Sequence, residues 1–230
     1  MKLTLIFFFL ISFSFGQVVP PKLDFELKNE LDEILKYDQI FREYADSETD
    51  EDRKSEILIL TGFKKEDLDK NLWNIITEND SINIKKVEKI INKYGYPGKS
   101  MVGMPTNITC WYVIQHSNKI KKYFPIIKAA GILKEIPNTN VVMMEDRMLM
   151  YEEKEQIYGT QRAGRLIINT SGKEDFFNFI WPIKDVLQVN ELRKQAGFKT
   201  TVEENAHNLG IEYKIFTLED YKKLNLKVKN

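Results

Sequence analysis

One histidine, two acid–arginine pairs and a glutamine are the side chains of this chain best suited to acid–base chemistry. His116 ends an otherwise apolar run, 108-ITCWYVIQHS-117. Because an imidazole titrates near neutral pH, His116 could act as a general acid or base at the wall of a pocket. A histidine at a helix C-terminus can also donate to the free backbone carbonyls there, which is a purely structural role. The sequence leaves both interpretations open.

An aspartate and an arginine follow each other inside an apolar segment. Asp146 and Arg147 lie within 141-VVMMEDRMLMYEEKE-155, where most neighbours are valine, methionine or leucine. Adjacent positions on a helix point about 100° apart, so one narrow polar face cannot hold both charges. Buried charges must be paired or hydrogen-bonded. The pair predicts either a structural ion pair with another element or a carboxylate and a guanidinium that line a pocket.

The segment 156-QIYGTQ-161 collects polar groups around a glycine. The amides of its two glutamines can donate and accept hydrogen bonds, and Tyr158 and Thr160 add hydroxyls. A strand that starts at position 157 would place Tyr158 and Thr160 on one face and Gln161 on the other. Gly159 would allow another backbone or a ligand to approach closely. We therefore count Tyr158 and Gln161 among the candidate substrate-binding residues.

A second acid–arginine pair lies near the N-terminus, in 38-DQIFR-42. Asp38 and Arg42 are four residues apart, which is the spacing of an ordinary ion pair on a helix surface. We also count both among the candidate substrate-binding residues.

The composition excludes several classes of function. The 230 residues include 34 basic and 34 acidic side chains, so no net charge draws the chain to nucleic acid or to an anionic membrane. With two histidines and one cysteine, the chain cannot supply the usual ligand set of a zinc site. No Walker loop, dinucleotide-binding glycine motif, CxxC pair or HExxH motif occurs. We therefore predict neither a metal nor a cofactor, although carboxylates alone could form a Ca²⁺ or Mg²⁺ site without EF-hand spacing.

The N-terminus predicts export. Lys2 precedes the apolar run 3-LTLIFFFLISFSF-15, and the small residues Ser14 and Gly16 precede Gln17 at cleavage-site spacing. We expect a signal peptide over residues 1–16, no membrane span after its removal, and a periplasmic or secreted protein. No cysteine follows the run, so a lipid anchor is not expected. The expected partner is a small molecule or a cell-envelope component.

The elements that must position these residues are mainly helical. After a loose lead-in over 17–22, we predict one globular domain over 23–230, with a polar turn at 46–54 and an irregular segment at 94–107. The segment 56–63 fits a helix or a strand. A β-hairpin over 157–169 and 175–183, with a turn at 169–174, is inserted in the C-terminal half. Helical periodicity is expected in these ranges: 23–45, 64–79, 81–95, 108–117, 119–135, 141–155, 189–197, 200–210 and 217–225. Asn107 is the expected cap of the helix over 108–117, and Thr217 and Asp220 resemble a capping box at the last helix.

These short polar motifs together resemble a bacterial family, domain-of-unknown-function family 6624. The resemblance extends from about Asp38 to Gly197 and is carried by these residues: 38-DQIFR-42, 94-YGYP-97, Val102, Gly103, 114-IQH-116, 145-EDR-147, 156-QIYGTQ-161, Pro182, Ile183, Asp185, Arg193 and Gly197. It implies a common architecture but no activity. It also groups the polar motif residues, which we expect to converge on one cleft.

We expect a hydrolase or a transferase in which His116 is the general acid or base and Asp146 orients it or stabilises its charged form. Arg147 and Gln161 would bind an anionic or carbonyl group of the substrate. Two alternatives stay open, a binding module without turnover and an interaction protein whose polar residues form a buried structural network.

Overall fold

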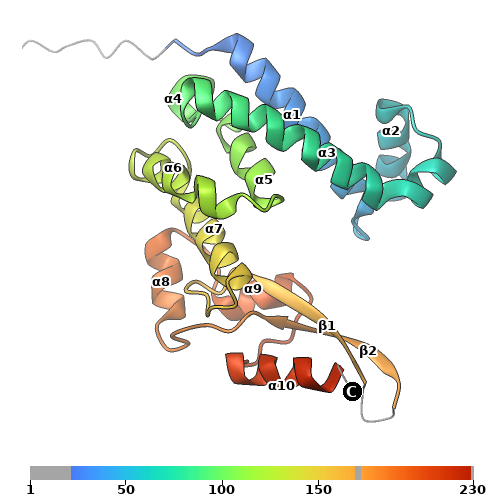
Figure 1. Ribbon diagram of the computed structural model, residues 1–230, viewed down its shortest axis with the longest axis vertical. Helices are drawn as coiled ribbons and strands as arrows, with labels where there is room; N and C mark the ends of the chain where they lie inside the picture. Colours follow the sequence, from blue (N-terminus) through green and yellow to red (C-terminus); the bar gives the residue numbers. More distant parts are fainter. Residues whose placement is uncertain (1–21, 169–171, 229–230) are drawn as a thin grey trace, which may run out of the picture.

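The computed structural model describes residues 22–168 and 172–228. The expected signal peptide over residues 1–16, and all but the last residue of the expected lead-in, lie outside these ranges. Within them the chain forms ten α-helices, one short 3₁₀-helix and one two-stranded antiparallel hairpin. The prediction of a mainly helical protein with a hairpin in its C-terminal half is therefore confirmed (Figure 1).

Two long helices form the N-terminal part of the molecule. Helix α1 (Phe25–Ala45) begins where Asp24 accepts a hydrogen bond from the backbone N–H of Leu27, at 3.0 Å. It packs along α3 (Lys65–Tyr94), and α2 (Glu51–Thr61) packs against the far end of both (Figure 1). The turn predicted over 46–54 is shorter than expected, because Asp50 caps α2 and starts the helix at Glu51. The ambiguous segment 56–63 is helical as far as Thr61.

Helix α3 is one continuous helix of 30 residues, and the predicted break near Asp80 is wrong. A short polar residue in such a pattern can cap a new helix, but the Asp80 carboxylate instead binds Arg42 of α1. The helix ends at Gly95, whose φ of 74° is in the region that favours glycine.

The irregular segment 94–107 contains the four-residue helix α4 (Lys99–Val102) and the 3₁₀-helix η1 (Thr106–Ile108). It leads into α5 (Thr109–Gln115), which crosses α1 and α3. Asn107 was expected to cap this helix. Its amide nitrogen instead donates to the carbonyl of Glu135, at 2.8 Å, and therefore joins η1 to the segment before α7.

Helices α6 (Ile120–Ile132) and α7 (Asn138–Tyr151) pack against each other, and Pro125 lies inside α6 without ending it. Their contact is close at Gly131, where an added Cβ would lie 2.5 Å from a methyl carbon of Val141. The main core lies between α1, α3, α5, α6 and α7. Cys110 is buried in this core, and its burial raises the pKa of the thiol, so Cys110 packs as a hydrophobic residue.

The hairpin consists of β1 (Arg162–Ile168) and β2 (Glu174–Ile180), and Arg162 pairs with Ile180. The predicted strand starting at 157 is wrong, because the backbone N–H groups of 157, 158 and 160 bind a carboxylate of α7. The second strand also ends earlier than predicted, at Ile180 and not at Ile183. Part of the predicted turn, residues 169–171, lies outside the described ranges.

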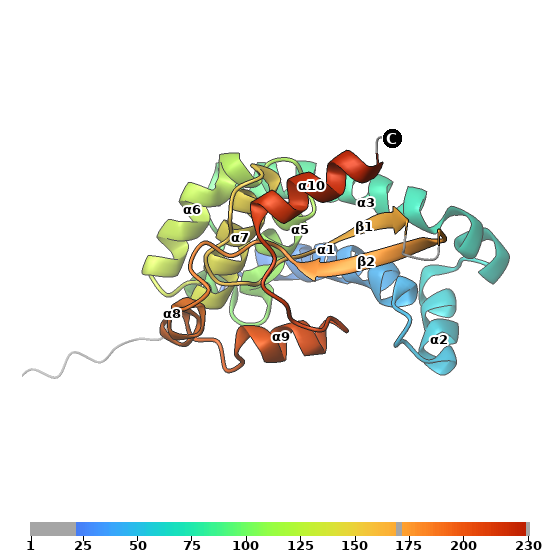
Figure 2. The same ribbon diagram turned by 90° about the horizontal axis from the view of Figure 1, so that it is seen from below.

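Three helices complete the C-terminal part: α8 (Val189–Ala196), α9 (Val202–Asn208) and α10 (Leu218–Val228). Figure 2 shows the hairpin between α9 and α10. Phe179 packs toward α10, and the next residue, Ile180, packs toward α9, as the alternation of a strand requires. The predicted capping box at Thr217 and Asp220 is present, with the two residues exchanging hydrogen bonds.

Candidate functional site

A buried carboxylate lies where α1 meets α3 and α5. Asp38 has no exposed surface, and its Oδ2 atom accepts a hydrogen bond of 2.6 Å from the Gln39 amide. Its other oxygen, Oδ1, has no hydrogen-bond partner among the described residues. Burial raises the pKa of Asp38 to about 6, against the opposing effects of Arg42, Gln39 and Asn83. Asp38 is therefore poised to gain or lose a proton near neutral pH.

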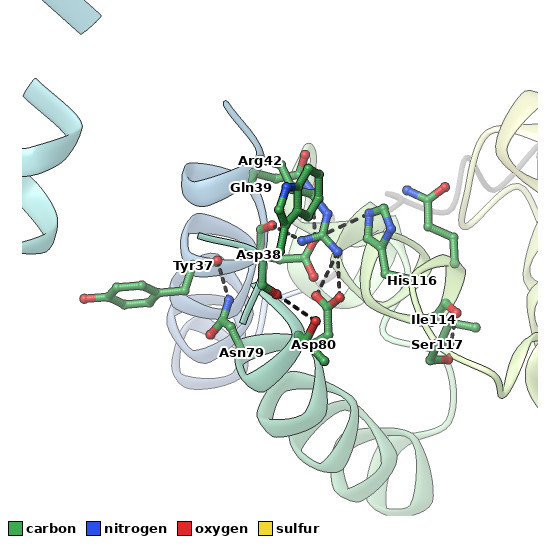
Figure 3. A network of polar contacts seen from close by, with 12 residues as sticks. Tyr37, Asp38, Gln39, Arg42, Asn79, Asp80, Ile114, His116 and Ser117 are labelled. Atoms are coloured by element: carbon green, nitrogen blue, oxygen red, sulfur yellow. Dashed lines mark hydrogen bonds and ion pairs between the residues drawn. The ribbon is translucent and has the colours of Figure 1, made fainter. Parts of the chain in front are cut away.

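Arg42 joins α1 to α3 beside this carboxylate (Figure 3). Its Nη2 atom lies 2.8 Å from each carboxylate oxygen of Asp80, and its Nη1 atom donates to the backbone carbonyl of Asp38 at 3.3 Å. The spacing of Asp38 and Arg42 suggested an ion pair between their side chains, and this is corrected by the structure. The Asp38 carboxylate is buried, and Arg42 turns to Asp80 instead.

His116 ends α5 and faces the same carboxylate. Its Nε2 atom lies 4.0 Å from Oδ2 of Asp38, and 22% of its side chain is exposed to solvent. Burial, and then the charges of Arg42 and Arg147, lower the pKa of His116 to about 3. The imidazole is therefore neutral at pH 7, and a distance of 4.0 Å is too long for a direct hydrogen bond.

Arg147 of α7 brings a second guanidinium to His116. Its Nε atom donates to Oε1 of Gln161 at 2.9 Å, and its Nη1 atom donates to the carbonyl of Gln115 at 3.2 Å. Among the described residues, no carboxylate forms an ion pair with it. Burial lowers the pKa of Arg147, and the charge of Arg42 acts in the same direction. The remaining N–H groups of this half-buried cation have no hydrogen-bond partner among the described residues.

Asp146 is fully buried, but it contacts the loop after α7 and not His116. Its carboxylate accepts hydrogen bonds from the backbone N–H groups of Ile157, Tyr158 and Thr160, and from the Thr160 hydroxyl, at 2.7 to 3.2 Å. Burial raises the pKa of Asp146, while these hydrogen bonds favour its ionised form. Asp146 thus holds the loop over 157–160. Among the described residues, the carboxylate that faces His116 is Asp38.

The same loop is held from its other side. Arg193 is almost completely buried, and its Nη1 atom donates to the Tyr158 carbonyl at 2.8 Å. Gln156 and Gln161 bond to each other through side chain and backbone, at 2.8 and 3.0 Å. Gly159 has a φ of 65°, and an added Cβ would lie 2.6 Å from a methyl carbon of Val202. The polar residues of 156–161 therefore fix a loop between α7 and the hairpin.

The sequence-predicted residues separate into two groups. Asp38, Arg42, His116, Arg147 and Gln161 form one connected cluster, which we call the His116 cluster. Asp146 holds the loop, and the loop presents Tyr158 to a groove between α6, α7 and α8. Asp80 and Asn83, which lie beside the cluster, and the role of Arg193 in the loop were not predicted from the sequence. The i+4 spacing from Ile76 to Asp80 along an unbroken α3 was the available signal for Asp80.

No arrangement of three or more His, Cys, Asp or Glu side chains suited to a metal ion is found in residues 22–168 and 172–228. None of the helices in this part of the chain is long and apolar enough to cross a membrane.

Comparison with known proteins places the chain in a family. The sequence model of a family described as "Family of unknown function (DUF6624)" matches residues 38–215, which is most of the chain and includes every residue of the His116 cluster. No curated protein and no solved structure matches the chain.

Proposed function

We propose, for this member of the DUF6624 family, that the His116 cluster binds a substrate through an anionic group and that His116 transfers a proton during its hydrolysis or group transfer. The observation that carries this proposal is a neutral, partly exposed imidazole between a buried carboxylate and a guanidinium with no carboxylate partner among the described residues.

Arg147 supplies the binding energy. A half-buried guanidinium beside a second arginine is electrostatically unfavourable, and burial already lowers its pKa. A carboxylate or phosphate group placed against its free N–H groups would offset both effects and can form two parallel hydrogen bonds. Gln161 and the Gln115 carbonyl fix the direction of the guanidinium.

His116 and Asp38 supply the proton transfer. The neutral imidazole can accept a proton from water or from an acceptor hydroxyl as that group attacks the substrate. The charge that then develops on His116 faces the Asp38 carboxylate, at 4.0 Å. Asp38 thereby takes the role of stabilising the charged imidazole, which we first expected of Asp146. Asp38 itself is fully buried, so it acts through His116 and not on the substrate.

Substrate binding would also tune His116. Its pKa is lowered to about 3 partly by the charges of Arg42 and Arg147. An anion bound to these arginines cancels part of that effect, so the pKa rises toward the neutral range where general acid–base catalysis is most effective. The low pKa of His116 in the free protein also supports a second candidate function, anion binding without turnover, because an imidazole with so low a pKa is a weak base.

The experiment compares three chromogenic esters: 4-nitrophenyl phosphate, mono-4-nitrophenyl succinate and the uncharged 4-nitrophenyl acetate. We expect faster turnover of an anionic ester than of the acetate, and a loss of about 10²-fold or more in kcat in His116→Gln. Arg147→Gln should raise KM for the anionic ester only. His207→Gln, which changes the other, exposed histidine, is the matched control. Unchanged activity in His116→Gln would contradict the proposal, and binding of the anionic esters without product would favour the second function.

We further propose that the protein is exported. The support is the sequence pattern of residues 1–16 and its cleavage-site spacing. Mass spectrometry of the protein from the cells that produce it should give a chain that begins at Gln17. An intact chain that begins at Met1 would contradict export by this route.

A further inference from the structure

A groove of about 410 Å³ lies between α6, α7 and α8, away from the His116 cluster. This volume is in the range of roughly 300 to 1,000 Å³ that is typical of small-molecule sites. Its apolar surface comes mainly from these residues: Ile132, Val141, Val142, Ile157, Leu192 and Ala196.

Two polar groups meet on the wall of this groove. Glu145 of α7 and Tyr158 of the loop both line it. The charge of Glu145 helps to raise the pKa of the Tyr158 hydroxyl, after burial, so the two groups lie near each other. Among the described residues, the Glu145 carboxylate forms no ion pair and the Tyr158 hydroxyl forms no hydrogen bond. A carboxylate and a tyrosine thus line the same groove, and among the described residues neither has a side-chain polar partner.

The groove is distinct from the His116 cluster because of the geometry of α7. Glu145 and Arg147 are two positions apart, which places them about 200° apart around the helix axis. Arg147 turns toward Gln115 and Gln161, whereas Glu145 turns toward the groove. The residue between them, Asp146, holds the loop that carries Tyr158.

The backbone of Tyr158 is held on both sides. Its backbone N–H donates to Asp146 and its carbonyl accepts from Arg193, so two buried side chains of opposite charge hold one residue. Such preorganised placement reduces the entropy that a ligand must overcome when it binds.

We infer that this groove is a second binding site, which takes a small ligand that has a positively charged amine and an apolar body. The amine contacts the Glu145 carboxylate and the face of the Tyr158 ring, and the apolar body lies on Val142, Ile157 and Leu192. A carboxylate excludes anions from this position, and the apolar surface disfavours a fully hydrated cation.

Lys128, an exposed residue that lines the groove, could distinguish a free amino acid from a simple amine as the ligand. Its Nζ atom lies 6.0 Å from the centre of the Phe124 ring, and among the described residues it forms no ion pair. A free amino acid could place its carboxylate at Lys128 while its amine binds Glu145. A simple amine could use only Glu145 and Tyr158.

The test is isothermal titration calorimetry on the mature protein with 3-methylbutylamine, leucine and 4-methylpentanoate, which share an apolar body and differ in charged groups. We expect the amine and leucine to bind and the acid not to bind. Glu145→Gln should weaken binding of both by about tenfold or more, while Glu153→Gln, a nearby exposed carboxylate, should not. If leucine binds more tightly than the amine and Lys128→Gln removes that preference, the ligand is an amino acid.

Two results would overturn the inference. One is no heat of binding from either amine-bearing probe, and the other is equal binding to the Glu145→Gln variant. Tyr158→Leu provides an independent measurement, because it keeps the apolar surface and removes the aromatic face. We expect it to weaken binding of 3-methylbutylamine several-fold, and unchanged affinity would exclude the cation–π contact.

Discussion

The Nε2 atom of His116 lies 4.0 Å from Oδ2 of the buried Asp38, although the two residues come from different helices and are far apart in the sequence. The buried carboxylate titrates at about 6, whereas the imidazole titrates at about 3. At neutral pH this contact therefore joins a carboxylate to a neutral imidazole and is not a salt bridge. A proton that reaches His116 during a reaction has a stabilising charge beside it.

The depressed pKa of His116 predicts how stability depends on pH. Between its ordinary value of 6.5 and about 3, the unfolded chain binds a proton that the folded protein does not. His116 therefore lowers the free energy of unfolding as pH falls through this range, by on the order of 1 kcal/mol per pH unit. His116→Gln should gain stability relative to the parent protein over the same range, as measured by urea unfolding.

The contribution of Asp38 to the pH dependence of stability has the opposite sign. Between pH 3.8 and about 6, the folded protein binds a proton at Asp38 that the unfolded chain has lost. Its contribution stabilises the folded state at low pH and is lost as pH rises through about 6. Both proteins contain Asp38. For this reason we compare the free energy of unfolding of His116→Gln with that of the parent protein at each pH, so that the contribution of Asp38 is subtracted. A difference that stays flat from pH 7 to pH 4 would show that the imidazole has an ordinary pKa.

Asp80→Asn should lower the pKa of Asp38. The negative charge of Asp80 helps to raise that pKa, and removing it also leaves the Arg42 charge uncompensated beside Asp38. The measurement is a carbon-detected NMR titration of the Asp38 carboxyl. Asp67→Asn, an exposed substitution in the first turn of α3, should leave the Asp38 titration unchanged. An equal titration in all three proteins would exclude electrostatic coupling through Arg42.

Asp146→Ala should destabilise the protein by about 3 kcal/mol or more, because it removes a fully buried carboxylate and leaves three partly buried backbone N–H groups without their acceptor. Glu145→Gln, one residue away, should change the free energy of unfolding little. Urea unfolding measures both. A stable but inactive Asp146→Ala protein would restore the catalytic role that the sequence suggested for this residue.

Gly159→Ala should cost more stability than Gly62→Ala, although both glycines have similar φ values, of 65° and 73°. Both substitutions bear the strain of an alanine at positive φ, about 1 to 2 kcal/mol. At Gly159 the new Cβ also meets Val202 at 2.6 Å, whereas nothing lies within 4 Å at Gly62. Overpacking adds about 1 to 3 kcal/mol. Equal thermal shifts in the two variants would show that the loop relaxes freely.

The sequence predicted the fold class well because helical periodicity is local. Thr217 and Asp220 form the predicted capping box, since its partners are three residues apart. The break predicted near Asp80 failed because its cause is not local. The carboxylate binds Arg42, 38 positions earlier, and the spacing from Ile76 indicates only the face of α3 that carries Asp80, not its partner.

The sequence predicted which residues lie in the candidate site better than it predicted the role of each residue. Asp38, Arg42, His116 and Arg147 do come together, but the sequence assigned the carboxylate beside His116 to Asp146. Consecutive helix positions point in different directions, so Glu145, Asp146 and Arg147 serve the groove, the loop and the cluster respectively. The partner that each of these side chains meets depends on how the helices pack, and the local sequence does not show that packing.

The central claim is that an anion at Arg147 controls the charge of His116. An NMR titration of the His116 ring, with and without sulfate at matched ionic strength, tests it most directly, because sulfate keeps its charge across the range. Without sulfate, the account predicts a pKa near the value of about 3. Sulfate should raise it by about one unit or more, and Arg147→Gln should remove this response. A pKa near 6.5 that sulfate does not change would contradict the account.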